Sequence, residues 1–267
     1  MIRQLHPWKN RTYIMGILNV TPDSFSDGGT YNSLDLAVKR AREIEKEGAD
    51  IIDIGGESTR PRYQPVSEEE ELERIIPVIR AVKANVNIPI SVDTYKGRVA
   101  DEAIRSGAMM INDVWGAKKD PSIASVAAKH RVPIILMHNR ENKHYIDLIS
   151  DIKKDLQASI HIAKKAGVKD DAIIIDPGLG FAKTGEHNLV ILKKLEQIVQ
   201  MNYPILLGAS RKGFIGKILD EPVDRRDIGT GATTCLAIMK GVRIVRVHNV
   251  TLNKQLALMM DSILKDK

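Results

Sequence analysis

Eight short apolar runs recur along the 267-residue sequence, and each gives way to polar or charged side chains of kinds that bind ligands or do chemistry. Segments of helical periodicity separate the runs. The runs cover residues 13–18, 51–54, 88–92, 109–111, 132–137, 173–175, 205–207 and 244–245. A strand–helix unit repeated eight times predicts an α/β fold, the (β/α)8 TIM barrel, whose active site is built from the carboxyl ends of its parallel strands.

Length and composition agree with one such barrel. A (β/α)8 barrel typically takes about 250 residues, so residues 1–267 are predicted to form a single domain. Hydrophobic residues make up 43% of the sequence and charged residues 28%, which is ordinary globular usage and allows a large core. Disordered and fibrous classes are therefore excluded.

The segments between the runs are predicted helices. They comprise residues 34–47, 67–84, 97–106, 122–130, 145–166, 188–200, 228–240 and 252–265. Ser67 and Glu70 form a capping box at the start of the second helix. Three connections after strands are longer than a compact unit needs, at residues 20–33, 55–66 and 208–227. Long connections of this kind usually carry lids or binding loops.

The charge, aromatic and cysteine content limit which binding partners and which cellular compartment can be expected. Lys and Arg outnumber Asp and Glu by 40 to 34, but most lysines lie among acids in the helical segments, as on a solvated outer ring. Aromatic residues are only 4%, so no nucleic-acid partner is predicted. No run of about 18 apolar residues occurs, so no membrane partner is predicted. Cys235 is the only cysteine, which fits a reducing cytoplasm.

The strongest sequence evidence for a ligand site is a group of cationic side chains after the last two strands. Ser210, Arg211 and Lys212 follow the seventh strand, and Arg246 and His248 follow the eighth. In these barrels the loops after strands 7 and 8 frequently bind a phosphate, and a guanidinium fork, an ammonium and an imidazole suit its oxygens. The alternative is a solvated turn at Arg211 and Lys212, with Arg246 in a structural ion pair.

Acidic side chains occur at or near the ends of three buried strands, at Asp53, Asp93 and Asp176. An unpaired carboxylate there would be costly, so each needs a partner such as a backbone N–H group, an arginine, a metal or the ring nitrogens of a substrate. Asp93 and Asp176, together with Asn112, form an acceptor–donor set suited to a heteroaromatic ring. Asp53 lies within its run, and a structural role is an equally good interpretation.

Two side chains near the strand ends could pack on such a ring. Phe181 follows the glycine-rich turn at residues 176–180, where backbone approaches a ligand closely, so its ring is placed to stack on a flat substrate. Met137, taken by itself, reads as a core residue.

Metal ligands are few. The sequence has no His-Glu-x-x-His motif, no cysteine cluster and no closely spaced histidines, which argues against zinc. Asn19 offers a hard amide oxygen. The remaining interpretation is a Mg²⁺ ion that contacts Asn19 and takes most of its other ligands from a substrate diphosphate, because Mg²⁺ often keeps few protein ligands.

Taken in order, these segments resemble the dihydropteroate synthase family. Residues 19–29 (NVTPDSFSDGG) and 53–61 (DIGGESTRP) resemble its first two signatures. Six shorter segments continue the resemblance, at residues 91–94, 111–113, 137–139, 176–181, 210–212 and 246–248. Any one tripeptide is weak, but eight segments in register at eight strand ends are specific and cover nearly the whole chain.

The resemblance implies a folate-pathway transferase. It would join p-aminobenzoate to (7,8-dihydropterin-6-yl)methyl diphosphate and release 7,8-dihydropteroate and diphosphate. It also implies Mg²⁺, a cytoplasmic homodimer and inhibition by sulfonamides. The implied chemistry is loss of diphosphate to a pterin-stabilised cation, followed by attack of the aromatic amine.

The resemblance also assigns residues. The pterin would contact Asp93, Asn112, Asp176 and Lys212, with Met137 and Phe181 packed on the ring. The diphosphate would meet Asn19 with its Mg²⁺, Arg60, Arg246 and His248. p-Aminobenzoate would lie near Phe25, Thr59, Pro61 and Ser210, with Thr59 also near the pterin diphosphate. The implied catalytic residues are Asp93, Lys212, Arg246 and His248.

One position departs from the family pattern, and other functions stay open at this point. Arg62 stands where the family usually has glycine, and arginine tolerates a positive φ poorly, so the p-aminobenzoate loop can take a different path. A pterin-dependent methyltransferase barrel would share the ring pocket but needs no diphosphate site. A non-catalytic pterin or phosphate binder would need no water-excluding loops, and a Schiff-base aldolase would need a lysine within a strand.

Overall fold

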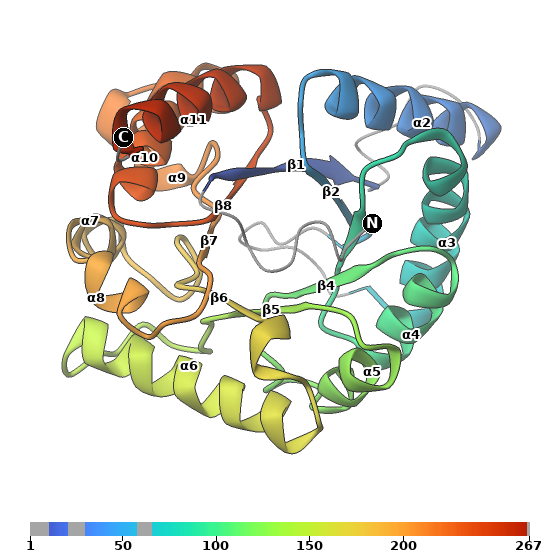
Figure 1. Cartoon of the computed structure of the whole chain (residues 1–267), viewed down its shortest axis with the longest axis horizontal. Helices are drawn as coiled ribbons and strands as arrows, with labels where there is room; N and C mark the ends of the chain where they lie inside the picture. Colours follow the sequence, from blue (N-terminus) through green and yellow to red (C-terminus); the bar gives the residue numbers. More distant parts are fainter. Residues whose placement is uncertain (1–10, 21–29, 58–65, 266–267) are drawn as a thin grey trace.

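The computed structural model describes residues 11–20, 30–57 and 66–265. Its strands are all parallel and form one sheet of order β6-β5-β4-β3-β2-β1-β8-β7. A bridge between Ile175 and Ile205 joins the two ends of the sheet, which closes into a barrel (Figure 1). The predicted (β/α)8 fold is confirmed. The strands are β1 (Tyr13–Asn19), β2 (Ile51–Gly55), β3 (Ile90–Asp93), β4 (Met110–Asp113), β5 (Ile134–Met137), β6 (Ile173–Asp176), β7 (Leu206–Leu207) and β8 (Ile244–Val247).

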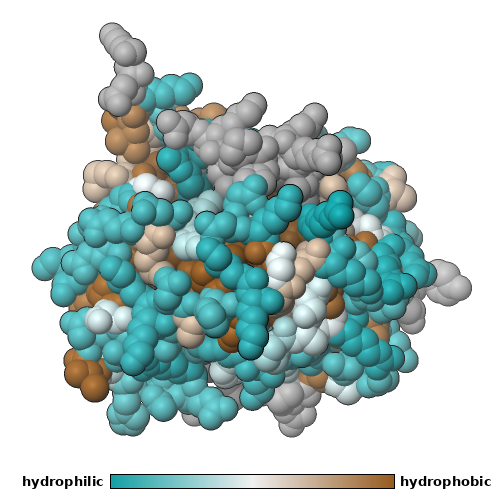
Figure 2. Space-filling model, turned by 60° about the horizontal axis from the view of Figure 1, so that its bottom comes forward, coloured by the Kyte–Doolittle hydropathy of each residue, from teal (hydrophilic) through white to brown (hydrophobic). Residues whose placement is uncertain are grey.

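Helices form a ring around the strands (Figure 1). Within the described ranges, no helix is long and apolar enough to cross a membrane. The face shown in Figure 2 is mostly hydrophilic, with apolar patches between the charged side chains. The helices are α2 (Thr30–Lys46), α3 (Glu68–Asn85), α4 (Gly97–Arg105), α5 (Ser122–His130), α6 (Leu148–Lys165), α7 (Gly185–Lys193), α8 (Glu196–Val199), α9 (Gly213–Leu219), α10 (Asp227–Met239) and α11 (Val250–Leu264), with short 3-10 turns η2 (Asp170–Ala172) and η3 (Val223–Arg225).

Two predicted segments are organised differently. The connection at 208–227 is not an open loop, because α9 and η3 lie within it. These pieces are too short for a helical period to show in the sequence. The helix predicted at 188–200 is two helices, and the first begins earlier, at Gly185, where Thr184 caps it by accepting from the His187 N–H group.

Side-chain alternation along the strands builds the barrel interior in layers. The lower part is apolar and consists of Tyr13, Met15, Ile51, Met110, Ile135, Ile174, Leu206 and Ile244. The next inward position on each strand, two residues further along, is polar on four strands: Asp53, Asn112, Asp176 and Arg246. Three of the residues predicted to bind ligands, Asn112, Asp176 and Arg246, therefore point into the barrel near the carboxyl ends of their strands.

Candidate functional site

Four polar side chains are joined in one network at the barrel mouth. Arg246 donates from Nε to Oδ2 of Asp53 at 2.6 Å and from Nη2 to Oδ2 of Asp93 at 2.7 Å. Asn112 donates from Nδ2 to the same oxygen of Asp53 at 3.0 Å. The Asp53 side chain is fully buried, whereas those of Arg246 and Asp93 keep 19% and 8% exposure. Arg246 and Asp93 are therefore the members of this ion-paired group that a ligand can reach.

The charges of this network are set by burial and pairing. Burial raises the pKa of Asp93 to about 7, although Arg246 lowers it. Burial acts to lower the pKa of Arg246, but Asp53 and Asp93 together outweigh it and the pKa is raised. The arginine is therefore always charged, while Asp93 gains or loses a proton near neutral pH. Asp53 takes the structural role, and Arg246 has an ion pair within the protein.

Asp176 and Lys212 form a second acid–base pair, on the β6 and β7 side. The carboxylate of Asp176 accepts from the Gly178 N–H group at 2.7 Å. The ammonium of Lys212 donates to the Leu179 carbonyl and lies 4.7 Å from the centre of the Phe181 ring. Burial lowers the pKa of Lys212 to about 8, although the negative charge of Asp176 acts to raise it. Burial raises the pKa of Asp176, although the positive charge of Lys212 acts to lower it.

A glycine lies between these groups. A Cβ atom built on Gly208 would stand 3.9 Å from Nζ of Lys212 and 4.0 Å from both Cβ of Arg246 and Oδ2 of Asp176. A longer side chain at this position would therefore extend among the three charged residues. Gly208 thus marks the point where Asp176, Lys212 and Arg246 converge, and the glycine has no side chain to cover them there.

The turn after β6 depends on glycine at one position. Gly178 has a φ of +68°, and a Cβ atom there would lie 2.1 Å from the carbonyl oxygen of His138 and 3.2 Å from Cγ of Met137. Any other residue would clash with backbone in addition to being strained. Because of this close packing, the turn that carries Phe181 lies directly against the end of β5.

Cationic residues after β7 and β8 have different surroundings. The hydroxyl of Ser210 lies 2.8 Å from Nδ1 of His248 and accepts from the His248 N–H group at 3.1 Å. Arg211 instead donates from both Nε and Nη2 to the carboxylate of Asp227, at 2.7 and 2.8 Å. The guanidinium of Arg211 is therefore paired with α10, and of the neighbours Arg211 and Lys212 it is Lys212 whose side chain enters the mouth.

The remaining predicted residues divide into two groups. Met137 ends β5 and is 3% exposed. Asn19 ends β1, beside Gly55 of β2, and is partly exposed. The others lie outside the described residues: Phe25, Thr59, Arg60, Pro61 and Arg62.

A buried polar group beside the mouth, formed by Lys183 and His138, is not evident from the sequence. Lys183 is 5% exposed and His138 is fully buried. The ammonium of Lys183 donates to Nδ1 of His138 at 2.8 Å and to the Phe181 carbonyl at 2.9 Å. A lysine between a turn and a helix cap normally reads as solvated, so only the folded arrangement shows its burial.

The described residues contain no group of three or more His, Cys, Asp or Glu side chains that could hold a metal. An ion at Asn19 would therefore take most of its ligands from substrate and water. That donor set suits Mg²⁺, which accepts hard oxygen ligands and dehydrates reluctantly.

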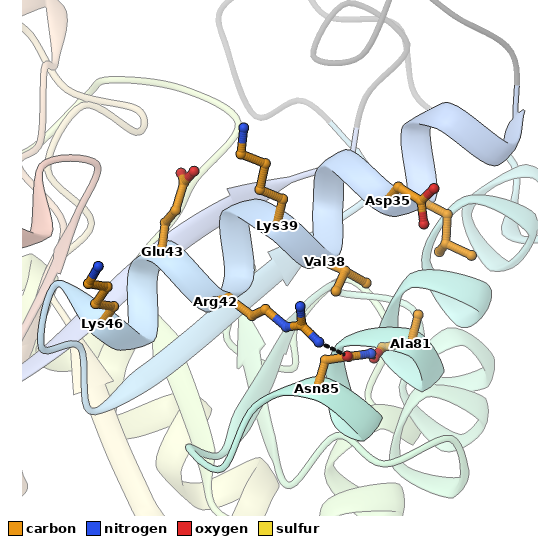
Figure 3. A pocket seen from close by; sticks show the side chains of 9 residues that line it. Asp35, Val38, Lys39, Arg42, Glu43, Lys46, Ala81 and Asn85 are labelled. Carbon is orange, nitrogen blue, oxygen red and sulfur yellow. Dashed lines mark hydrogen bonds between the residues drawn. The ribbon is translucent and has the colours of Figure 1, made fainter.

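A separate groove lies on the outer wall of the barrel. It has a volume of about 640 Å³ and runs between α2 and α3, where Lys39, Glu43 and Lys46 border it (Figure 3). Arg42 crosses it and donates to Asn85 at 2.5 Å. No buried acid or base faces this groove among its lining residues. The barrel mouth is thus the better candidate site.

Comparison with known proteins identifies the family of the chain. Residues 15–248 match the family model of pterin-binding enzymes. A dihydropteroate synthase of Bacillus subtilis (strain 168) is 57% identical over 257 residues, which cover 96% of this chain and 90% of that protein. The chain belongs to the dihydropteroate synthase family.

Solved structures of dihydropteroate synthases agree. The enzyme from Clostridium difficile, solved in the presence of pteroic acid, is 50% identical with a TM-score of 0.94, over 96% of this chain and 98% of that one. The enzyme from Xanthomonas albilineans with 4-aminobenzoic acid is 39% identical with a TM-score of 0.92, over 96% and 94%. The predicted family is confirmed, and the dihydropteroate synthase name of these relatives does not support the methyltransferase alternative.

Proposed function

We propose that the chain condenses p-aminobenzoate with (7,8-dihydropterin-6-yl)methyl diphosphate to give 7,8-dihydropteroate and diphosphate. The observation that carries this proposal is the convergence of Asp176, Lys212 and Arg246 around Gly208. Asp93 and Asn112 belong to the hydrogen-bonded network of Arg246, so the mouth offers two acids, an amide and two cations. These groups can pair with the ring nitrogens and oxygen of a pterin and with a departing anion. Family membership supports the same reaction.

Pterin binding would use both acid–base pairs. The carboxylates of Asp93 and Asp176 accept ring N–H groups, and Lys212 donates to a ring acceptor. Asn112 is held by its bond to Asp53, which leaves its amide oxygen for the ligand. Met137 and Phe181 supply apolar faces for the ring.

Departure of the diphosphate would be helped by cations preplaced at the mouth. Arg246 and His248 lie at the end of β8, and Arg246 is already fixed by two carboxylates, so it needs no reorganisation during the reaction. Asn19 would hold Mg²⁺, which neutralises diphosphate charge when bound. Arg60 is proposed to add a further guanidinium.

Loss of diphosphate leaves a cation delocalised into the pterin, and the carboxylates of Asp93 and Asp176 stabilise it. The amine of p-aminobenzoate then attacks the exocyclic carbon and loses one proton to solvent. An aromatic amine is neutral near neutral pH, so no dedicated general base is needed. Ser210 is the described member of the set proposed to contact p-aminobenzoate, which also includes Phe25, Thr59 and Pro61. Sulfonamides would compete for this position.

The pKa values predict a bell-shaped pH dependence of pterin binding. Ring N–H groups bind the ionised form of Asp93, whose pKa is about 7 in the free protein. Binding lowers that pKa and releases a proton, so affinity rises as the pH increases through 7. Above about 8 the ammonium of Lys212 loses its proton and affinity falls. Calorimetry should show an increase of about sixfold from pH 6 to pH 7.5. Asp93→Asn should lack this rise, and the same rise in that variant would contradict the assignment.

The proposed reaction is tested by its product. Purified protein with both substrates and Mg²⁺ should form 7,8-dihydropteroate, detected by chromatography, and removal of Mg²⁺ with a chelator should slow it. Pterin binding without any condensation product would instead favour the binding-only interpretation.

We also propose the homodimer and the cytoplasmic location implied by the resemblance. Exposed apolar side chains on adjacent helices support a partner surface: Ile228 and Met239 on α10, and Leu258, Met259 and Ile263 on α11. α10 and α11 pack against each other, so these residues are candidates for one shared interface. The free thiol of Cys235 supports a reducing compartment.

A further inference from the structure

Lys183 is a buried lysine that the proposed reaction leaves unused. Burial lowers the pKa of its ammonium to about 7, although Asp176 raises it. A buried cation is costly unless its protons are bonded. Its two acceptors, Nδ1 of His138 and the carbonyl oxygen of Phe181, belong to different parts of the barrel mouth. Lys183 therefore ties the turn after β6 to the residue that follows β5.

Asp155, on the opposite side of the His138 ring from Lys183, fixes the orientation of that ring. Because Nδ1 of His138 accepts from Lys183, Nε2 carries the ring hydrogen and donates to Asp155 of α6 at 3.1 Å. Burial, and then Lys183, lower the pKa of His138 to about 3, so the ring is neutral. Asp155 also accepts from Nε of Arg140 at 2.5 Å. The His138 ring is thus held on both of its nitrogens, by Lys183 and by Asp155.

The rest of the turn is already fastened by other residues. Four of its backbone groups have side-chain partners: Gly178 with Asp176, Leu179 with Lys212, Gly180 with Asn188 and Ala182 with Tyr145. The Phe181 carbonyl is the group that Lys183 holds. The Phe181 side chain stands beside Lys212, the proposed pterin ligand, so a shift of this peptide would move a wall of the pocket.

We propose that Lys183 is a positioning residue for the pterin substrate, because it fastens the Phe181 carbonyl to His138 and so fixes the Phe181 ring where the pterin packs. Lys183 does not touch the reacting atoms. Its contribution therefore falls on pterin binding and spares p-aminobenzoate. This role rests on the pterin placement proposed above.

Lys183→Met tests the role, because methionine is an unbranched side chain only one atom shorter than lysine and donates no hydrogen bond. The Michaelis constant for the pterin diphosphate should rise about 10- to 100-fold. The Michaelis constant for p-aminobenzoate and the value of kcat should both stay within about threefold of those of the wild-type protein. Lys118→Met is the matched control, because Lys118 is a half-buried lysine whose ammonium donates to a carbonyl oxygen, that of Asn139 at 2.8 Å, and not to the turn after β6. It should change both constants less than about twofold.

An unchanged constant for the pterin diphosphate in Lys183→Met, or equal rises for both substrates, would overturn the role. If the methionine variant does not fold, Lys183→Gln carries the same test, because its amide keeps an N–H donor group on a shorter side chain and should give a smaller rise for the pterin substrate alone. No rise in a folded Lys183→Gln would also overturn it. Wild-type protein that fails to bind the pterin in calorimetry would overturn the proposed function instead.

Discussion

Lys212→Met should lower kcat/KM for the pterin diphosphate by about 100- to 1000-fold while the barrel stays folded. Lys212 is the proposed donor to the ring and the positive charge facing the buried Asp176. Its loss removes that donor and also the charge that lowers the pKa of Asp176, so the pKa of this acid rises further. The higher pKa disfavours the carboxylate form that accepts a ring N–H group. Steady-state kinetics, pterin calorimetry and thermal unfolding together measure the effect.

The neighbouring residue is the control for this variant. Arg211 is paired with Asp227 on α10 and does not face the mouth. Arg211→Gln should therefore cost some stability but leave kcat/KM within about threefold. Near-wild-type turnover in a folded Lys212→Met protein, or equal losses in both variants, would show that the pterin site has been misplaced.

Arg246→Ala should destabilise the protein by about 3–5 kcal/mol at neutral pH, because it leaves the buried carboxylates of Asp53 and Asp93 without their cation. The pKa of Asp93, already raised above its unfolded value, rises further. A raised carboxylate pKa costs stability as the pH increases from the unfolded value through the folded one. The deficit should therefore be smaller at pH 5 than at pH 8. Denaturant unfolding at the two pH values measures it.

Arg246→Ala should also weaken binding of inorganic diphosphate more than binding of free pterin, since the guanidinium is the proposed anion contact at β8. A second variant separates the two effects. Arg246→Met combined with Asp53→Asn removes one buried charge along with the cation and should recover part of the stability but none of the diphosphate affinity. Equal loss of diphosphate and pterin binding in Arg246→Ala would contradict this placement of the phosphate.

Much of the site could be predicted because side chains alternate along a strand, so the inward-facing positions can be read from the sequence. Asp53, Asn112, Asp176 and Arg246 each follow an inward apolar residue by two positions, so the period that builds the core also places the polar layer. Position along a strand does not reveal partners, however. Asp53 and Arg246 are 193 residues apart, and they come within 2.6 Å because β2 and β8 pair with opposite edges of β1.

Other features depend on local geometry that leaves no period in the sequence. α9 has only seven residues, so it was hidden in a predicted loop. Arg211 and Lys212 look equivalent in sequence, but Arg211 has a φ of 55° and its side chain pairs with α10, while that of Lys212 enters the mouth. The burial of Lys183 follows from the turn packing on β5, which sequence position alone does not show.

Release of diphosphate tests the central claim most directly. The purified protein is mixed with (7,8-dihydropterin-6-yl)methyl diphosphate and Mg²⁺, with and without p-aminobenzoate, and free diphosphate is followed over time. We predict that p-aminobenzoate accelerates the release of diphosphate and that one molecule of 7,8-dihydropteroate forms for each diphosphate released. Pterin binding without release under either condition would contradict it and leave a pterin-binding barrel of different activity.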